Sequence, residues 1–340
     1  MNLRVHFNCC TLAGLLTASS LAHAPLPATA SDRITFFHGM CDASAIVPLG
    51  RQYQLIADDE DNVLRLFDRQ RGGRALWATD LSRFLQVDPQ EPEVDLEAAA
   101  RLGDRIYWIS SHGRNRKGLP RPSRHRFFAT AIVERGGLPT VEPIGRPVTT
   151  LLHHMLADPR LAPLGLPAAS LRPPKASNAL SIEGLVALPD GRLLLGFRNP
   201  QPFGKALIVP LDNPAEVIEG RPPRFGDPLL LDLGHRGIRG MGTHRDRVII
   251  AAGAHDGAVR PLLFEWDPIR QTGPWPVPDL SLEEFNPESI EGLSEEQGEG
   301  LLLVSDDGAV RVGRTECKKL KDPALKRFRT LTLPHLQPTP

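Results

Sequence analysis

Three glutamates stand at the same place in three copies of a short motif. The copies are Asp95-Leu96-Glu97-Ala98-Ala99, Ser181-Ile182-Glu183-Gly184-Leu185 and Ser289-Ile290-Glu291-Gly292-Leu293. Two weaker copies place Ser44 and Arg239 at the same position. If the copies meet in space, carboxylates and a guanidinium group share one confined site, where like charges raise carboxyl pKa values unless a cation or an arginine neutralises them.

The spacing of these motifs indicates what positions them. Their third residues, at 44, 97, 183, 239 and 291, are separated by 53, 86, 56 and 52 residues. Each unit contains about four strand-like segments separated by Gly, Asp or Pro turns, and that length and strand number are typical of a β-propeller blade. The sequence therefore predicts an all-β protein, a five-bladed β-propeller. Six blades are the alternative, if the long second interval hides strands.

That long interval contains an insertion at about 148–177. It includes a stretch at 151–156 that we expect to form a short helix, set among proline-rich connections. A segment of this length exceeds an ordinary loop between blades. It is either a lid over one face or a packed surface decoration, and we favour the packed decoration.

Ring closure is expected at the N-terminus. The strand-like segment at 34–37 has no blade of its own, and pairing it with the last blade removes an exposed sheet edge. Cys41 follows this segment and Cys317 belongs to the last unit. A disulfide between them is predicted, as part of the same closure; two free thiols are the alternative.

The second strand of each blade returns to the face from which the first one starts, so a second set of residues should join the motif residues at one channel mouth. This set comprises Asp58, Ser111 with His112, Arg198, Ala254 with His255, and Asp306. The segment at 110–118 adds glycines and three cations, Arg114, Arg116 and Lys117, which suit an anion. A solvated hairpin tip is the alternative for that segment.

Three interpretations of this mouth compete. In the first, Arg198 and Arg239 pair with the glutamates as a structural network. In the second, a divalent cation, most plausibly Ca²⁺, takes carboxylate oxygens; its expected ligands are Asp58, Glu97, Glu183, Glu291 and Asp306. In the third, the basic groups bind an anion such as a phosphoester or a carboxylate.

Composition and the N-terminal segment limit the classes of protein to which this chain could belong. The 340 residues carry 40 basic and 40 acidic side chains, and 41% are hydrophobic, which argues against disordered and nucleic-acid-coating proteins. Residues 1–30 combine an early arginine, an apolar run at 12–21 and small-residue sites ending at Ala24 and Ala30, the pattern of a secretory signal cleaved after one of them. We expect export to the periplasm or beyond, one propeller domain at 31–340, and no stable membrane insertion after cleavage.

Motifs of familiar hydrolases and nucleotide-binding proteins are absent. The sequence has no Gly-x-Ser-x-Gly, His-Glu-x-x-His, P-loop or dinucleotide motif. The segments at 95–100, 107–115, 182–185, 196–200 and 237–240 together resemble domain-of-unknown-function family 3616, over roughly residues 40–310. That resemblance implies a propeller-like, usually bacterial protein without an established activity. A more distant similarity to esterase-like, phytase-type propellers implies Ca²⁺ and phosphoester chemistry.

We thus predict an exported propeller that binds a small anionic or metal-bridged ligand at the channel mouth. The expected ligand-binding residues are Glu97, His112, Arg114, Glu183, Arg198, Asn199, Arg239 and Glu291. A calcium-dependent phosphoesterase is one alternative, in which His112 or a metal-bound water handles the proton or attacks phosphorus. A protein-interaction scaffold with a purely structural ion-pair network is the other. No nucleic-acid partner is expected.

Overall fold

The computed structural model describes residue 1 and residues 34–257, 261–277, 282, 285–293, 297 and 300–333. Apart from residue 1, the signal predicted at 1–30 lies outside these residues. Within them, no helix has the length and apolar character needed to cross a membrane.

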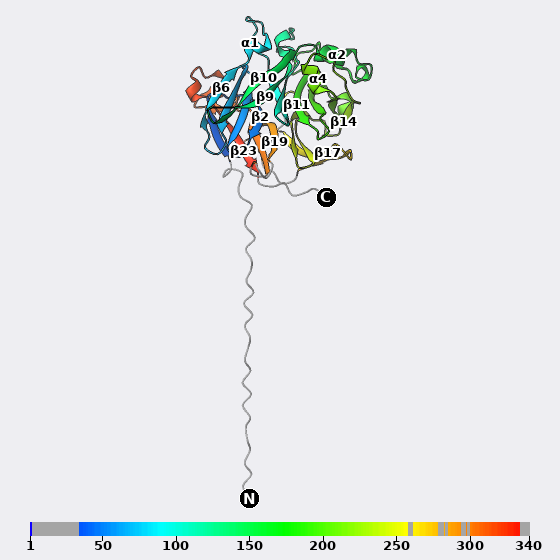
Figure 1. Ribbon diagram of the computed structural model, residues 1–340. Coiled ribbons are helices and arrows are strands. Elements are labelled where there is room, and N and C mark those ends of the chain that lie inside the picture. Colours follow the sequence, from blue (N-terminus) through cyan, green and yellow to red (C-terminus); the bar gives the residue numbers. More distant parts are fainter. Residues whose placement is uncertain are drawn as a thin grey trace.

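Five mainly antiparallel sheets follow one another along the chain and form the blades of a propeller (Figure 1). Blade 1 contains β2 (Ala43–Leu49), β3 (Tyr53–Asp58), β4 (Val63–Asp68) and β6 (Trp77–Asp80). Blade 2 contains β7 (Leu96–Leu102), β8 (Arg105–Ser110), β9 (Phe127–Arg135) and β10 (Leu138–Val148). Blade 3 contains β11 (Ser181–Ala187), β12 (Leu193–Asn199), β13 (Ala206–Leu211) and β14 (Leu229–Leu231). Blade 4 contains β15 (Gly237–His244), β16 (Arg247–Gly253), β17 (Leu262–Asp267) and β18 (Thr272–Pro276).

Blade 5 is assembled from both ends of the chain. Its order is β19 (Pro287–Leu293), β20 (Gly300–Ser305), β23 (Arg327–Leu333) and β1 (Ile34–His38), with β5 (Gly73–Arg74) parallel to β1 at the outer edge. The strand β1 pairs antiparallel with β23, from Ile34 opposite Leu331 to His38 opposite Arg327. The predicted five-bladed fold and its closure by an N-terminal strand are confirmed. A short hairpin stands apart from this blade: β21 (Arg311–Val312) pairs with β22 (Thr315–Glu316).

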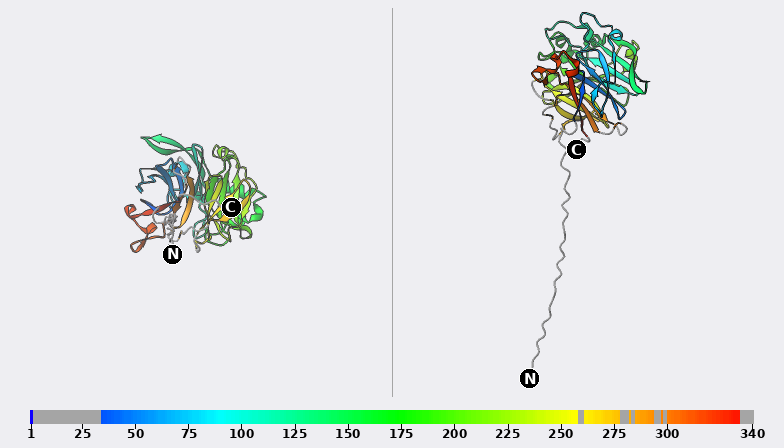
Figure 2. Two further views of the ribbon diagram at one scale, coloured as in Figure 1. Left: turned by 90° about the horizontal axis from the view of Figure 1, so that it is seen from below. Right: turned by 90° about the vertical axis from the view of Figure 1, so that its left-hand side faces the viewer.

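The inner strands β2, β7, β11, β15 and β19 contact one another in this order, and β19 contacts β2 again, which closes the ring. Figure 2 shows the blades in two further orientations. Apolar side chains fill the spaces between neighbouring sheets. Gly184 is required in one such space, because a Cβ atom there would lie 2.8 Å from both Ile238 Cγ2 and Met241 Sδ.

The insertion packs against the ring. It contains α2 (Leu151–Ala157), the 3₁₀ turn Ala162–Leu164 and α3 (Leu166–Ala169), and no strand in the described residues. The side chains of Leu151, Leu152 and Met155 are buried in the core between blades 2 and 3. Together with α1 (Ser82–Leu85), α2 lies at the upper end of the molecule in Figure 1, where the connections to the inner strands run. Another short helix, α4 (Pro214–Ile218), lies between β13 and β14.

The predicted disulfide is present. Cys41 and Cys317 are both buried, with Cα atoms 5.9 Å apart, and the bond joins positions separated by 276 residues. Close by, Phe37 of β1 stacks on Phe328 of β23, and both meet Phe67 of blade 1 edge to face. Closure therefore rests on strand pairing, an aromatic cluster and a covalent bond.

Breaking the Cys41–Cys317 bond should lower the free energy of unfolding by about 2–5 kcal/mol, because a long loop regains freedom in the unfolded chain. Guanidinium unfolding of the oxidised protein, the reduced protein and Cys317→Ser measures this loss. Reductant should not shift the midpoint of Cys317→Ser further. Equal midpoints for all three samples would contradict a stabilising role of the bond.

Candidate functional site

Near the start of every inner strand, one residue is left out of the pairing with the second strand. In β7 the pairing passes from Leu96 opposite Ser110 to Ala98 opposite Ile109, so Glu97 has no partner across the sheet. The five residues skipped in this way are Ser44, Glu97, Glu183, Arg239 and Glu288. An extra residue of this kind is a β-bulge, which bends the strand and redirects a side chain.

In blade 5 the bulge residue is Glu288, three residues before Glu291. The motif alignment that gave Glu291 this position is therefore wrong. Glu291 pairs regularly with Leu302, and its side chain lies outside the described part of the chain. The residues at the bulge of blade 5 are Asn286-Pro287-Glu288-Ser289-Ile290. The segment at 289–293 misleads the alignment because all five of its residues are identical to those at 181–185.

Four of the five bulge residues, all except Ser44, line one pocket of about 600 Å³. A second set lies two residues before the bulges and also lines the pocket: Asp42, Asp95, Ser181 and Asn286. Loops that follow second strands add Asp59, Ala254 and Asp306, and the insertion adds Pro174 and Lys175. The lining contains eleven acidic and seven basic residues, so carboxylates outnumber cations inside the pocket.

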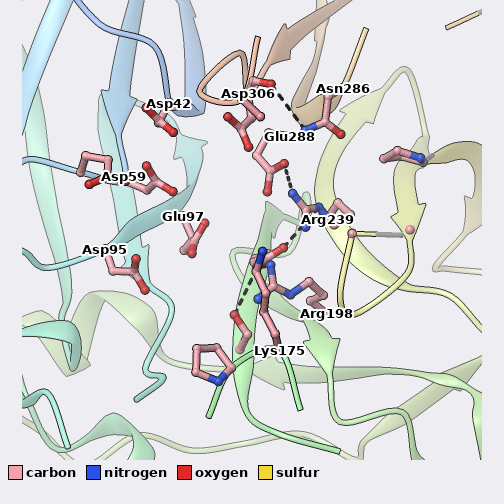
Figure 3. Close-up of a pocket in the computed structure, with 18 of the residues that line it drawn as sticks. Asp42, Asp59, Asp95, Glu97, Lys175, Arg198, Arg239, Asn286, Glu288 and Asp306 are labelled. Carbon is pink, nitrogen blue, oxygen red and sulfur yellow. Dashed lines mark hydrogen bonds and ion pairs between the residues drawn. The ribbon is translucent and has the colours of Figure 1, made fainter. Parts of the chain in front are cut away.

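One side of the pocket is an ion-pair network, drawn in Figure 3. Glu183 Oε1 lies 2.5 Å from Arg198 Nη1, and Glu183 Oε2 lies 3.5 Å from Arg239 Nε. Arg239 Nη2 also donates to Glu288 Oε2. Burial acts to lower the pKa of Arg239, but the carboxylates of Glu288 and Glu183 raise it. Burial raises the pKa of Glu288 to about 8, although Arg239 opposes the shift.

The opposite side carries Asp42, Asp59, Asp95 and Glu97 (Figure 3). Asp95 accepts hydrogen bonds from Ser111 Oγ and from Arg124 Nη1, the latter at 3.0 Å. Asp42 has Lys318 Nζ at 3.7 Å, yet burial and the nearby Asp306 raise its pKa to about 7. We call Asp42, Asp59, Asp95 and Glu97 the carboxylate wall.

Within this wall, Glu97 is the least compensated group. The residue is 8% exposed, and among the described residues it makes no hydrogen bond and no ion pair within 4.0 Å. Burial raises its pKa well above the ordinary glutamate value, and Glu183 and Asp95 raise it further. The pKa of Asp59 is also raised, by burial first and then by Glu97. Asp59 Oδ1 is buried and accepts no hydrogen bond. Negative charge here therefore exceeds what the protein neutralises.

Carboxylate oxygens in the pocket approach closely enough to share cations. Three sets each bring three oxygens within 4.8 Å of one another: Asp42, Asp58 and Asp59; Asp59, Asp95 and Glu97; and Glu97, Glu183 and Glu288. Two oxygens bound to one Ca²⁺ lie up to about 5 Å apart, since each is 2.3–2.6 Å from the ion. The donors are all hard oxygens, which suit Ca²⁺ or Mg²⁺ better than Zn²⁺.

The structure separates the predicted site residues into two groups. Glu97, Glu183, Arg198, Arg239 and Asp306 line the pocket. Asp58 lies just behind it, within one of the carboxylate sets, while its neighbour Asp59 faces the pocket. The sequence analysis does not assign Asp59, Asp95 or Glu288 to the site. The signal for Asp95 is the polar residue that stands two positions before the bulge in four of the five blades.

The other predicted residues, His112, Arg114 and Asn199, do not line the pocket. His112 is buried, its Nδ1 lies 2.8 Å from the Ser110 carbonyl oxygen, and burial together with His125 lowers its pKa to about 3. Arg114 donates to carbonyl oxygens of Ser170 and Gly118. Asn199 donates to the carbonyl oxygen of Ala176 at 2.8 Å. These side chains therefore form hydrogen bonds to the backbone at the end of β8, in the loop after it and in the insertion, and they stabilise those segments.

Comparison with known proteins finds structural neighbours at low similarity. No family model matches the chain, and no curated protein matches it. Among solved structures, it is similar to glutaminyl cyclase from Myxococcus xanthus, at 11% identity and a TM-score of 0.46, over 88% of this chain and 94% of that one. It is also similar to a putative oxidoreductase (glucose dehydrogenase) from Thermus thermophilus, at 15% identity and a TM-score of 0.46, over 88% of this chain and 99% of that one. Similarities at this level say nothing about the chemistry of the pocket.

The raised carboxyl pKa values predict that the cation-free protein loses stability as the pH rises from 6.5 to 8. Asp42 and Glu288 hold protons in this range only when folded, so the folded state loses an advantage as their protons leave. His112 acts in the opposite direction, but its effect is complete above the ordinary histidine pKa of about 6.5. Melting temperatures in EDTA measure the fall. A melting temperature that rises across this range would contradict it.

Proposed function

We propose that this protein is an exported propeller that binds a divalent cation, Ca²⁺, at the carboxylate wall, together with a small anionic ligand. Glu97 is the observation that supports this most strongly, because an ionised carboxylate buried without a partner is costly. A bound cation would neutralise it together with Asp59 and Asp95, which lie within reach of the same ion. The disulfide supports export to an oxidising compartment. Membership of family 3616 stays a prediction from the motifs.

A purely structural network accounts for only part of the pocket. Glu183, Arg198, Arg239 and Glu288 compensate one another. Glu97 and Asp59 lie outside these pairs, and a scaffold that needed only rigid blades has no reason to retain them. The interaction-scaffold hypothesis therefore explains the cationic side of the pocket but leaves the carboxylate wall unexplained.

The phosphoesterase hypothesis has two candidate groups for proton transfer, His112 and a cation-bound water, and the position of His112 argues against the first. The imidazole of His112 lies behind the pocket lining, and its low pKa keeps it neutral at ordinary pH. A cation-bound water remains the group that this hypothesis would use. Nothing in the geometry favours turnover over binding, and we propose binding.

Replacing Glu97 by Gln should weaken Ca²⁺ binding about tenfold or more, since the ion loses one charged ligand. Isothermal titration of EDTA-stripped protein with CaCl₂ measures the affinity. Glu142→Gln is the matched control, because Glu142 pairs with Arg135 on an exposed part of β9 and β10. Absence of any Ca²⁺ or Mg²⁺ binding by the wild-type protein would refute the proposal.

The same variant separates a cation ligand from a structural carboxylate. In EDTA, Glu97→Gln should melt at a higher temperature than the wild-type protein, because folding no longer buries a carboxyl group that is ionised in the unfolded chain and whose pKa the fold raises. In saturating Ca²⁺ the order should reverse, since the ion stabilises the wild-type fold by mass action. If Glu97→Gln melts at a lower temperature in EDTA, Glu97 has a structural partner and the proposal is wrong.

A further inference from the structure

The cations that line the pocket differ in whether a carboxylate already compensates them. Arg124, Arg198, Arg239, Lys318 and Arg329 each form an ion pair with a carboxylate. Lys175 and Arg116 line the same pocket and form none among the described residues. They are therefore the cations whose charge is available to an incoming ligand.

Lys175 is brought to the mouth by the end of the insertion. Asn199 Nδ2 donates to the carbonyl oxygen of the next residue, Ala176, at 2.8 Å. Arg114 Nε donates to the Ser170 carbonyl oxygen at 2.7 Å, and Arg114 Nη1 donates to the Gly118 carbonyl oxygen at 2.9 Å. Arg114 thus ties the insertion to the loop after β8, which also carries Arg116. The two loop-holding residues fix where Lys175 lies.

Positive charge converges on Lys175. Lys175 is exposed at the mouth, and its pKa is lowered by partial burial first and then by Arg116, Arg198, Lys318 and Arg239. In Figure 3, Lys175 and Arg198 lie across the pocket from the carboxylate wall. A ligand that contacts both Lys175 and the carboxylate wall must be negatively charged at Lys175. On the side of the wall it must bind a cation that Glu97 holds, because two anions would repel each other.

We propose that Lys175 is the residue that recognises the anionic group of the ligand, and that this group is a phosphate monoester. The inference rests on the proposed cation site. A phosphate monoester is close to a dianion at neutral pH and offers three oxygens that point in different directions. One oxygen can complete the coordination of the cation while another accepts from Lys175. The two oxygens of a monocarboxylate lie on one side of one carbon and carry a single charge. They are therefore less suited to contact Lys175 and a cation bound at Glu97 at the same time.

Phenyl phosphate and benzoate are matched probes, because they share the ring and differ in the anionic group. Titrated into wild-type protein saturated with Ca²⁺, phenyl phosphate should bind at least tenfold more tightly than benzoate, and tenfold more tightly than it does in EDTA. Equal affinities for the two probes, or no binding of phenyl phosphate in Ca²⁺, would overturn the assignment of the ligand class. Equal phenyl phosphate affinity in Ca²⁺ and EDTA would overturn the bridging arrangement.

Lys175→Ala should weaken phenyl phosphate binding at least tenfold while leaving the affinity for Ca²⁺ alone within twofold of the wild-type value. Lys175→Arg should restore most of the loss. Lys117→Ala is the control, because Lys117 is exposed on the loop after β8 and does not line the pocket. Unchanged phenyl phosphate binding by Lys175→Ala would refute the role of Lys175 without touching the cation site. Absence of Ca²⁺ binding by the wild-type protein would instead refute the proposed function.

Discussion

The pocket depends on one extra residue near the start of each inner strand. Regular pairing would alternate side chains between the two faces of a blade. The bulge interrupts this alternation at the level of the mouth, and in four blades the residue set free is a carboxylate or a guanidinium that lines the pocket. Because the five blades surround one axis, groups up to 191 positions apart in the chain, Glu97 and Glu288, come within 4.8 Å. The fold brings the inner strands together around the axis, and the bulges direct the charged side chains into the pocket.

The two sides of the pocket differ in how far their carboxylates are paired with arginines. On the side of blades 3, 4 and 5, Arg239 lies between Glu183 and Glu288, and each group satisfies the next. On the side of blades 1 and 2, Arg124 pairs with Glu93 and Asp95, and within the described part of the chain Glu97 and Asp59 form no ion pair of their own. A protein selected for rigidity alone would gain by replacing such groups with apolar ones. Their retention in a buried site is the physical reason to look for a ligand.

Sequence reasoning predicted the blade number, the closing strand and the disulfide, because these follow from repeat length and from the need to pair a sheet edge. It also brought Glu97, Glu183, Arg198 and Arg239 to one mouth. It failed where the exact register decides the outcome: the bulge in blade 5 contains Glu288 and not Glu291, and the loop after β3 presents Asp59 and not Asp58. The role of Asn199 was missed for a different reason. Its amide supports the backbone of a segment 23 positions away, and no local pattern reveals that contact.

The disulfide holds more than the ends of the chain. Cys41 precedes Asp42 and Cys317 precedes Lys318, and these two neighbours form an ion pair at the edge of the pocket. The backbone N–H of Asp307, another lining residue, donates to the carbonyl oxygen of Cys41. The redox state of the surroundings and the geometry of the cleft are thereby connected: reducing this one bond would free the backbone on both sides of the Asp42–Lys318 ion pair, where two segments far apart in the chain meet.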